Sequence, residues 1–189
     1  MHAALKYSGV LSGCAALALS AVVVAASVET SQDKYNLKVP GGLAFSEFKG
    51  YESWQAVSVS QDAGAYALIL ANPAMIEAFR TGAPGNGKAF PDGAKMAKVH
   101  WTPKTSTTFP AAMVPGALLN VDFMVKDSKR FADSGGWGYA VFDYDVASDK
   151  FKPGDEHSSP PQGHDAKCGF ACHTIVKTRD YVFTEYGRR

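Results

Sequence analysis

Apolar and polar residues alternate in several separate stretches of this chain, which is the period of a β-strand with one buried face. The alternation is clearest over 118–126, where Leu119, Val121, Phe123 and Val125 occupy every second position. Shorter stretches of the same kind, bounded by turn residues, predict strands at 54–60, 66–70, 94–101, 137–145 and 181–184.

The strongest helix signal begins at Asn72-Pro73. An asparagine side chain can accept hydrogen bonds from the free amides of a first helical turn, and proline is favoured at the first helical position. Gly82 marks the end of this helix, and weaker signals predict a short helix around 43–48 and a helical turn at 128–132. This order of elements predicts a mainly β (α+β) fold: an antiparallel sheet of about five strands with two or three helices.

Three segments lack a regular pattern. Residues 27–50 are expected to form an N-terminal arm, and residues 102–116, which are rich in threonine and proline, an irregular excursion. Residues 150–165 contain three prolines, two glycines and two histidines, and predict a long loop. A long loop inside a compact domain is often functional.

Residues 1–26 have the composition of a cleavable secretory signal. Lys6 precedes an apolar run that is shorter than the roughly 20 residues of a membrane span, and the run ends in small residues that suit cleavage. Cys14 closes a lipoprotein-like box, but most of the apolar run follows it, which argues against lipid attachment. We therefore expect export to the periplasm, loss of the signal and a single domain over 27–189, with an uncleaved anchor as the alternative.

The charge of the chain is balanced, with 19 basic and 18 acidic side chains. Such a balance gives no electrostatic footprint for nucleic acid or for an anionic membrane surface. The roughly 160 residues that follow the signal are enough to bury the core of one domain.

The main candidate for chemistry is the segment Cys168-Gly169-Phe170-Ala171-Cys172-His173. A cysteine pair followed by histidine suits covalent haem attachment, because the thiols bond the porphyrin and the imidazole reaches the iron, but the usual spacing is C-x-x-C-H. Here three residues separate the cysteines, and Gly169 could absorb the difference through an unusual backbone conformation. A disulfide between Cys168 and Cys172 is the alternative. A zinc site that adds His157 and His164 matches no common spacing.

Three parts of the chain together carry a family resemblance: the helix start at Asn72-Pro73, the stretch Phe90–Lys98, and the cysteine–histidine segment with its tail Asp180–Thr184. With these motifs the chain resembles the cytochrome P460 family, which includes the cytochromes c′-β, from about Tyr51 to Tyr186. The resemblance implies a small β-rich periplasmic haem protein, commonly a homodimer. It further implies haem c bound through Cys168 and Cys172, with His173 as the axial iron ligand.

The resemblance also implies what the haem does. An open iron position would bind nitric oxide or carbon monoxide, or oxidise hydroxylamine with transfer of electrons to a soluble redox partner. A gas-binding protein of the c′-β kind without turnover, or a haem-free domain with the disulfide, are the alternatives.

In the oxidising members of the family a lysine is cross-linked to the haem, and Lys98 is our candidate. It shares a strand face with Met96 and His100, whereas Lys95 points to the other face; a solvated strand lysine is the alternative. Oxidation also needs a base. The sequence offers these without selecting among them: Glu156, Asp143, Asp145 and Asp165.

Overall fold

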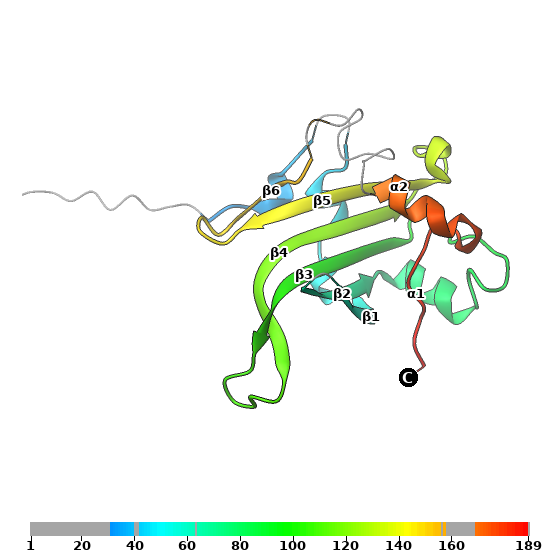
Figure 1. Ribbon diagram of the computed structural model, residues 1–189. Helices are drawn as coiled ribbons and strands as arrows, with labels where there is room; N and C mark the ends of the chain where they lie inside the picture. The colour runs from blue at the N-terminus through cyan, green and yellow to red at the C-terminus, as the bar shows by residue number, and fades with distance from the viewer. Residues whose placement is uncertain (1–30, 40–41, 63, 156, 158–168, 189) are drawn as a thin grey trace, which may run out of the picture. The chain divides into compact units, whose positions relative to one another are not determined.

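An antiparallel sheet runs through the protein, in a computed structural model that describes residues 31–188 apart from 40–41, 63, 156 and 158–168 (Figure 1). Its strands are hydrogen-bonded in the order in which they follow along the chain. Within the described residues there are six: β1 (Gln55–Asp62), β2 (Ala65–Ala71), β3 (Lys95–Thr105), β4 (Met113–Lys126), β5 (Trp137–Asp145) and β6 (Lys150–Pro153). The expected mainly β fold is therefore confirmed, with one strand more than predicted.

Two α-helices and five short 3-10 helices accompany the sheet in the described residues. They are α1 (Pro73–Arg80), α2 (Gly169–His173), η1 (Lys34–Asn36), η2 (Phe45–Phe48), η3 (Tyr51–Ser53), η4 (Ala132–Ser134) and η5 (Thr174–Arg179). The predicted cap of α1 is confirmed, because Asn72 Oδ1 accepts a hydrogen bond from the Met75 amide at 3.1 Å. The helical turn expected at 128–132 is present as a single turn, closed by the Phe131 amide on the Asp127 carbonyl at 3.0 Å, and it leads into η4.

Gln32–Arg189 form one compact unit. None of the helices in the described residues is long and apolar enough to cross a membrane. The predicted signal at 1–26, including Cys14, lies outside the described residues.

The N-terminal segment covers one face of the sheet. Phe45 and Phe48, both fully buried, pack on aromatic residues of the central strands, with the Phe48 ring stacked on Phe123 at 4.1 Å and the Phe45 ring 4.6 Å from Phe142. Burying several aromatic rings in one cluster supplies a large share of the hydrophobic stabilisation of a domain this size. The irregular arm expected here is thus part of the core.

The opposite face is covered by α1 and by the C-terminal segment that follows α2 (Figure 1). Met75, Ile76 and Phe79 of α1 are buried against it, and Tyr186 stacks on Phe79 with ring centroids 5.6 Å apart. Val182 is buried in the same cluster. This is the face on which the candidate site lies.

The segment predicted as an irregular excursion is largely a β-hairpin. β3 and β4 continue to Thr105 and from Met113, so that the hairpin projects beyond the other strands (Figure 1). Pro103 and Pro115 lie opposite each other in its register. Because proline has no N–H to donate to a neighbouring strand, the local sequence disfavours strands here. The long pairing of β3 with β4 outweighs this local preference.

Two further predictions are corrected by the structure. The expected loop at 150–165 begins with β6, which pairs with β5 from Asp145↔Lys150 onward, and positions 156 and 158–165 lie outside the described residues. The expected strand at 181–184 belongs to no sheet in the described structure. Its alternation arises because Val182 points into the core over the sheet face while Phe183 is half-exposed.

Candidate functional site

A cavity of about 900 Å³ opens between the sheet and the C-terminal segment. This volume is at the upper end of the range for small-molecule and cofactor sites. β1 to β5 form its floor and the residues from α2 onward its wall. The residues that line it include Ser58, Ser60, Ile69, Met96, Lys98, Asn120, Asp122, Met124, Tyr139, Val141, Gly169, Cys172, His173, Val182 and Phe183.

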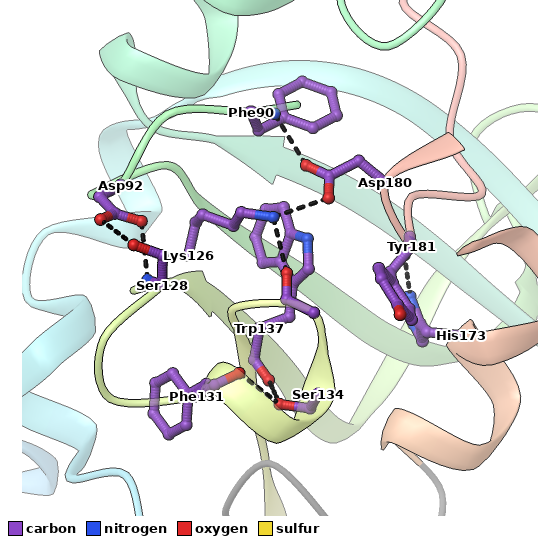
Figure 2. A network of polar contacts seen from close by, with 11 residues as sticks. Phe90, Asp92, Lys126, Ser128, Phe131, Ser134, Trp137, His173, Asp180 and Tyr181 are labelled. Atoms are coloured by element: carbon purple, nitrogen blue, oxygen red, sulfur yellow. Dashed lines mark hydrogen bonds and ion pairs between the residues drawn. The ribbon is translucent and has the colours of Figure 1, made fainter. Parts of the chain in front are cut away.

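His173, the last residue of α2, is fixed in this wall by a short hydrogen bond. Its Nδ1 lies 2.5 Å from the carbonyl oxygen of Tyr181 (Figure 2). A carbonyl can only accept, so Nδ1 carries a proton, and in the neutral ring Nε2 then keeps its lone pair. The ring is also held between aromatic neighbours, with centroids 5.0 Å from Tyr139 and 5.0 Å from Phe183.

Burial lowers the pKa of His173, and the nearby charge of Lys98 lowers it further, whereas the hydrogen bond to Tyr181 opposes the shift. A lowered pKa keeps the imidazole neutral at neutral pH. Neutral imidazole with Nδ1–H bonded to a carbonyl is the form in which histidine binds metals. The geometry of His173 is therefore that of a ready metal ligand.

The chain reverses direction at Asp180 and Tyr181, and this brings the Tyr181 carbonyl back to His173. Both residues have left-handed backbone conformations, with φ of 49° and 62°. Such conformations are uncommon for residues other than glycine, and the surrounding structure must hold them.

Gly169 is needed in this site for space. It is the first residue of α2. A Cβ at this position would lie 2.4 Å from Tyr139 Cβ and 2.6 Å from Tyr139 Cγ. Glycine therefore lets the start of α2 approach β5 closely, which sets the distance of His173 from the sheet.

Of the two predicted cysteines, Cys172 directly precedes His173 in α2 and borders the cavity. It is exposed and carries a free thiol in the described structure. Cys168 lies outside the described residues. The helix thus brings one thiol and one imidazole to the same wall.

Lys98 also reaches this cavity, although it lies 75 residues from His173 in the chain. It stands on β3 opposite Ile69 of β2 and Asp122 of β4. Lys95 points to the other face, where its Nζ donates to the Glu47 carbonyl at 2.5 Å. The structure therefore brings Lys98, Cys172 and His173 together and separates Lys95 from them.

Asp122, one of the carboxylates that line the cavity, is a residue that the sequence analysis missed. Asp122 accepts hydrogen bonds from Asn120 Nδ2 at 2.7 Å, and its other oxygen lies 3.1 Å from His100 Nε2. The signal was present in the sequence, because Asn120 and Asp122 are polar members of the best alternating strand. Only the strand pairing shows that this polar face meets Lys98.

The acidic residues proposed from the sequence are not among the described residues that line the cavity. Asp145 accepts hydrogen bonds from the Ala147 amide and the Ser148 hydroxyl in the turn after β5, because a short polar side chain is needed there. Asp143 is not among the residues that border the cavity in the described structure. Glu156 and Asp165 lie outside the described residues.

The zinc alternative finds no support in the described part of the chain, where no three histidine, cysteine or acidic side chains come close enough to hold a metal ion. His157 is exposed, and its backbone amide donates to Asp155. His164 lies outside the described residues.

Comparison with known proteins gives one family. The family model described as Cytochrome P460 matches residues 48–184. No curated protein matches the chain.

Proposed function

The chain belongs to the cytochrome P460 family, and on this premise we propose that it is an exported c-type haem protein. It binds nitric oxide or oxidises a small nitrogen compound such as hydroxylamine, and it passes electrons to a soluble redox partner. The observation that carries the proposal is His173: a neutral imidazole whose Nε2 has no partner among the described residues, next to Cys172, in the wall of a cavity of about 900 Å³. The predicted signal at 1–26 supports export to the periplasm.

The cavity residues fit a haem. A neutral imidazole is the commonest protein ligand of haem iron. Apolar side chains such as Met96, Met124 and Val182 offer surface for a porphyrin face. The Tyr139 hydroxyl is buried and has no hydrogen-bond partner among the described residues, so a donor is available there to a bound group. Burial raises the pKa of this hydroxyl, which keeps its proton in place.

In this proposal His173 holds the iron, and Cys168 and Cys172 hold the porphyrin. A haem with one protein ligand supplies an open iron position for small gases or hydroxylamine and a store for electrons. Asp122 is placed to take up a proton from a substrate, with Asn120 and His100 orienting its carboxylate.

A covalent bond between Lys98 and the porphyrin would distinguish a catalytic function from gas binding. Its ammonium group has no hydrogen bond or ion pair recorded within the described residues, and it borders the same cavity as His173. A lysine that is free of partners is available for a covalent bond to the porphyrin. If this bond is absent, the protein is a gas-binding member of the family.

The first experiment asks whether the chain carries haem. The full chain is exported in a host that matures c-type cytochromes, and its absorption spectrum and intact mass are recorded. We expect a coloured protein whose mass is increased by that of haem, and reduced loading in Cys168→Ala and Cys172→Ala. Cys14→Ala is the control and should load normally, because Cys14 leaves with the signal. A colourless protein lacking two hydrogens would establish the disulfide alternative.

The second experiment compares Lys98→Arg with Lys104→Arg. Lys104 is exposed farther along β3, so it controls for the substitution on the same strand. If Lys98 is cross-linked, the wild type and Lys104→Arg contain a third protein–haem bond by mass spectrometry and oxidise hydroxylamine. Lys98→Arg should lose both properties and keep carbon monoxide binding. Absence of the third bond from the wild type favours the gas-binding function.

A further inference from the structure

A buried ion pair joins β4 to the C-terminal segment. Lys126 Nζ lies 2.6 Å from Asp180 Oδ1, and only 7% and 12% of the two side chains are exposed. Lys126 also donates to the Gly135 carbonyl at 2.8 Å and lies over the Trp137 ring, 5.0 Å from its centroid. The second oxygen of Asp180 accepts from the Phe90 amide at 2.7 Å (Figure 2). Lys126 and Asp180 are therefore each held in place by several polar contacts at once.

Such a pair is not explained by stability alone. Removing two charges from water has a large cost, and apolar side chains of similar size often stabilise a core as well or better. Lys126 is the last residue of β4, and the residues before it, Met124 and Val125, are apolar and buried. Unlike an apolar contact, the directed bonds of the ion pair fix the position of the Asp180 backbone.

The position of Asp180 sets that of the next residue, Tyr181. Both have left-handed backbones, and the Tyr181 carbonyl is the group that accepts from His173 Nδ1. Tyr181 is also held by its ring, which lies against Gly135: a Cβ on Gly135 would be 2.1 Å from Tyr181 Cε2. Gly135 thus contributes in two ways: its carbonyl accepts a hydrogen bond from Lys126, and its lack of a Cβ leaves room for the Tyr181 ring.

We propose that Lys126 and Asp180 are positioning residues that hold the Tyr181 carbonyl in reach of His173 and so fix the tautomer and orientation of that ring. They act through Tyr181, and neither side chain borders the cavity in the described structure. The effect on the histidine belongs to the polypeptide itself. The effect on iron rests on the proposed function: a firmly bonded Nδ1–H makes Nε2 a stronger ligand.

The polypeptide part is tested on the full chain prepared without haem. Nitrogen NMR of the His173 ring reports which nitrogen carries the proton and how fast that proton exchanges with water. The wild type should show one tautomer, protonated on Nδ1. In Asp180→Asn and Lys126→Met we expect a mixture of tautomers and proton exchange faster by about tenfold, which corresponds to the roughly 1.4 kcal/mol that a well-made hydrogen bond contributes.

The haem part is tested on the loaded protein. Lys126→Met and Asp180→Asn should weaken the bond between iron and His173, which lowers the iron–histidine stretching frequency in the ferrous state and shifts the reduction potential. A purely structural pair would leave both unchanged. If the wild type carries no haem, the proposed function fails, but the NMR comparison still judges the positioning role.

Two further variants control for misfolding and for nonspecific effects of removing a charge. Lys126→Met/Asp180→Asn removes both charges, so that neither is left buried and alone if a single variant fails to fold. Lys34→Met is the matched control on the opposite face: Lys34 pairs with Glu52 and lies over Tyr51, far from the C-terminal segment. It should leave the His173 signals unchanged. Unchanged His173 signals in Asp180→Asn and in the double variant would overturn the proposal.

Discussion

Replacing Gly169 by alanine should displace α2 from the sheet. The added Cβ would meet Tyr139 Cβ at 2.4 Å and Cγ at 2.6 Å, whereas carbon atoms in contact lie about 3.5–4.0 Å apart. Tyr139 Cβ is attached to the backbone of β5 and cannot rotate away. The start of α2 must therefore move by about 1 Å, and it takes Cys172 and His173 with it.

The size of the effect follows from two opposing contributions. Forcing an extra methyl group into a packed contact costs about 1–3 kcal/mol. Alanine is favoured over glycine in a helix by up to about 1 kcal/mol. With the middle of the first range set against the full second value, the free energy of unfolding should fall by about 1 kcal/mol, which lowers the melting temperature of a domain of this size by about 2–4 °C.

Thermal unfolding of the haem-free full chain measures this change, and haem loading after export measures its consequence for the site. Gly187→Ala is the matched control, because a Cβ there meets no atom within 4 Å and its stability should change by no more than about 0.5 kcal/mol. We expect Gly169→Ala to melt earlier and to load less haem than Gly187→Ala. Equal melting temperatures together with equal loading would refute the close packing of α2 on Tyr139.

Three other predictions concern the rest of the molecule. Phe45→Ala should lower the free energy of unfolding by about 3–5 kcal/mol, because Phe45 is fully buried among aromatic rings; urea unfolding tests this, and a loss below 1 kcal/mol would contradict it. Asn72→Ala should cost about 1 kcal/mol, since its carbonyl oxygen accepts from the amides of Met75 and Lys95, and an unchanged melting temperature would show that the cap contributes nothing. Burial lowers the folded-state pKa of His173, so its contribution to stability is complete above the ordinary pKa of about 6.5 and is lost as pH falls through the lower folded value. Haem-free wild type should therefore lose more stability on acidification from neutral pH than His173→Asn, which keeps a donor for the neighbouring carbonyl; parallel pH curves would exclude the shift.

The features predicted correctly from the sequence depend on neighbours along the chain. Alternation of apolar residues located the central strands, and β5 has the predicted bounds of Trp137–Asp145. The Asn72-Pro73 start of α1 was readable because a cap and its partner lie three residues apart. The same local reasoning placed Lys98 on one face of its strand and Lys95 on the other.

Local patterns failed where distant segments set the structure. The long hairpin of β3 and β4 formed across Pro103 and Pro115 because pairing over many residues outweighs the loss of two donors. The segment at 181–184 alternates like a strand, yet the left-handed backbones of Asp180 and Tyr181 direct it over the sheet face.

The sequence by itself determined where the central strands lie, the helix cap and the residue types that suit haem: two cysteines, a histidine and a lysine on a strand. These are properties of neighbouring residues, and periodicity or spacing reveals them. Only the tertiary structure decided that Lys98, Asp122 and His173 meet at one cavity, that glycine at 169 is needed for space, and that the Lys126–Asp180 pair stands behind the Tyr181 carbonyl. Each of these joins residues tens of positions apart, and such contacts exist only once the sheet and the C-terminal segment have packed together.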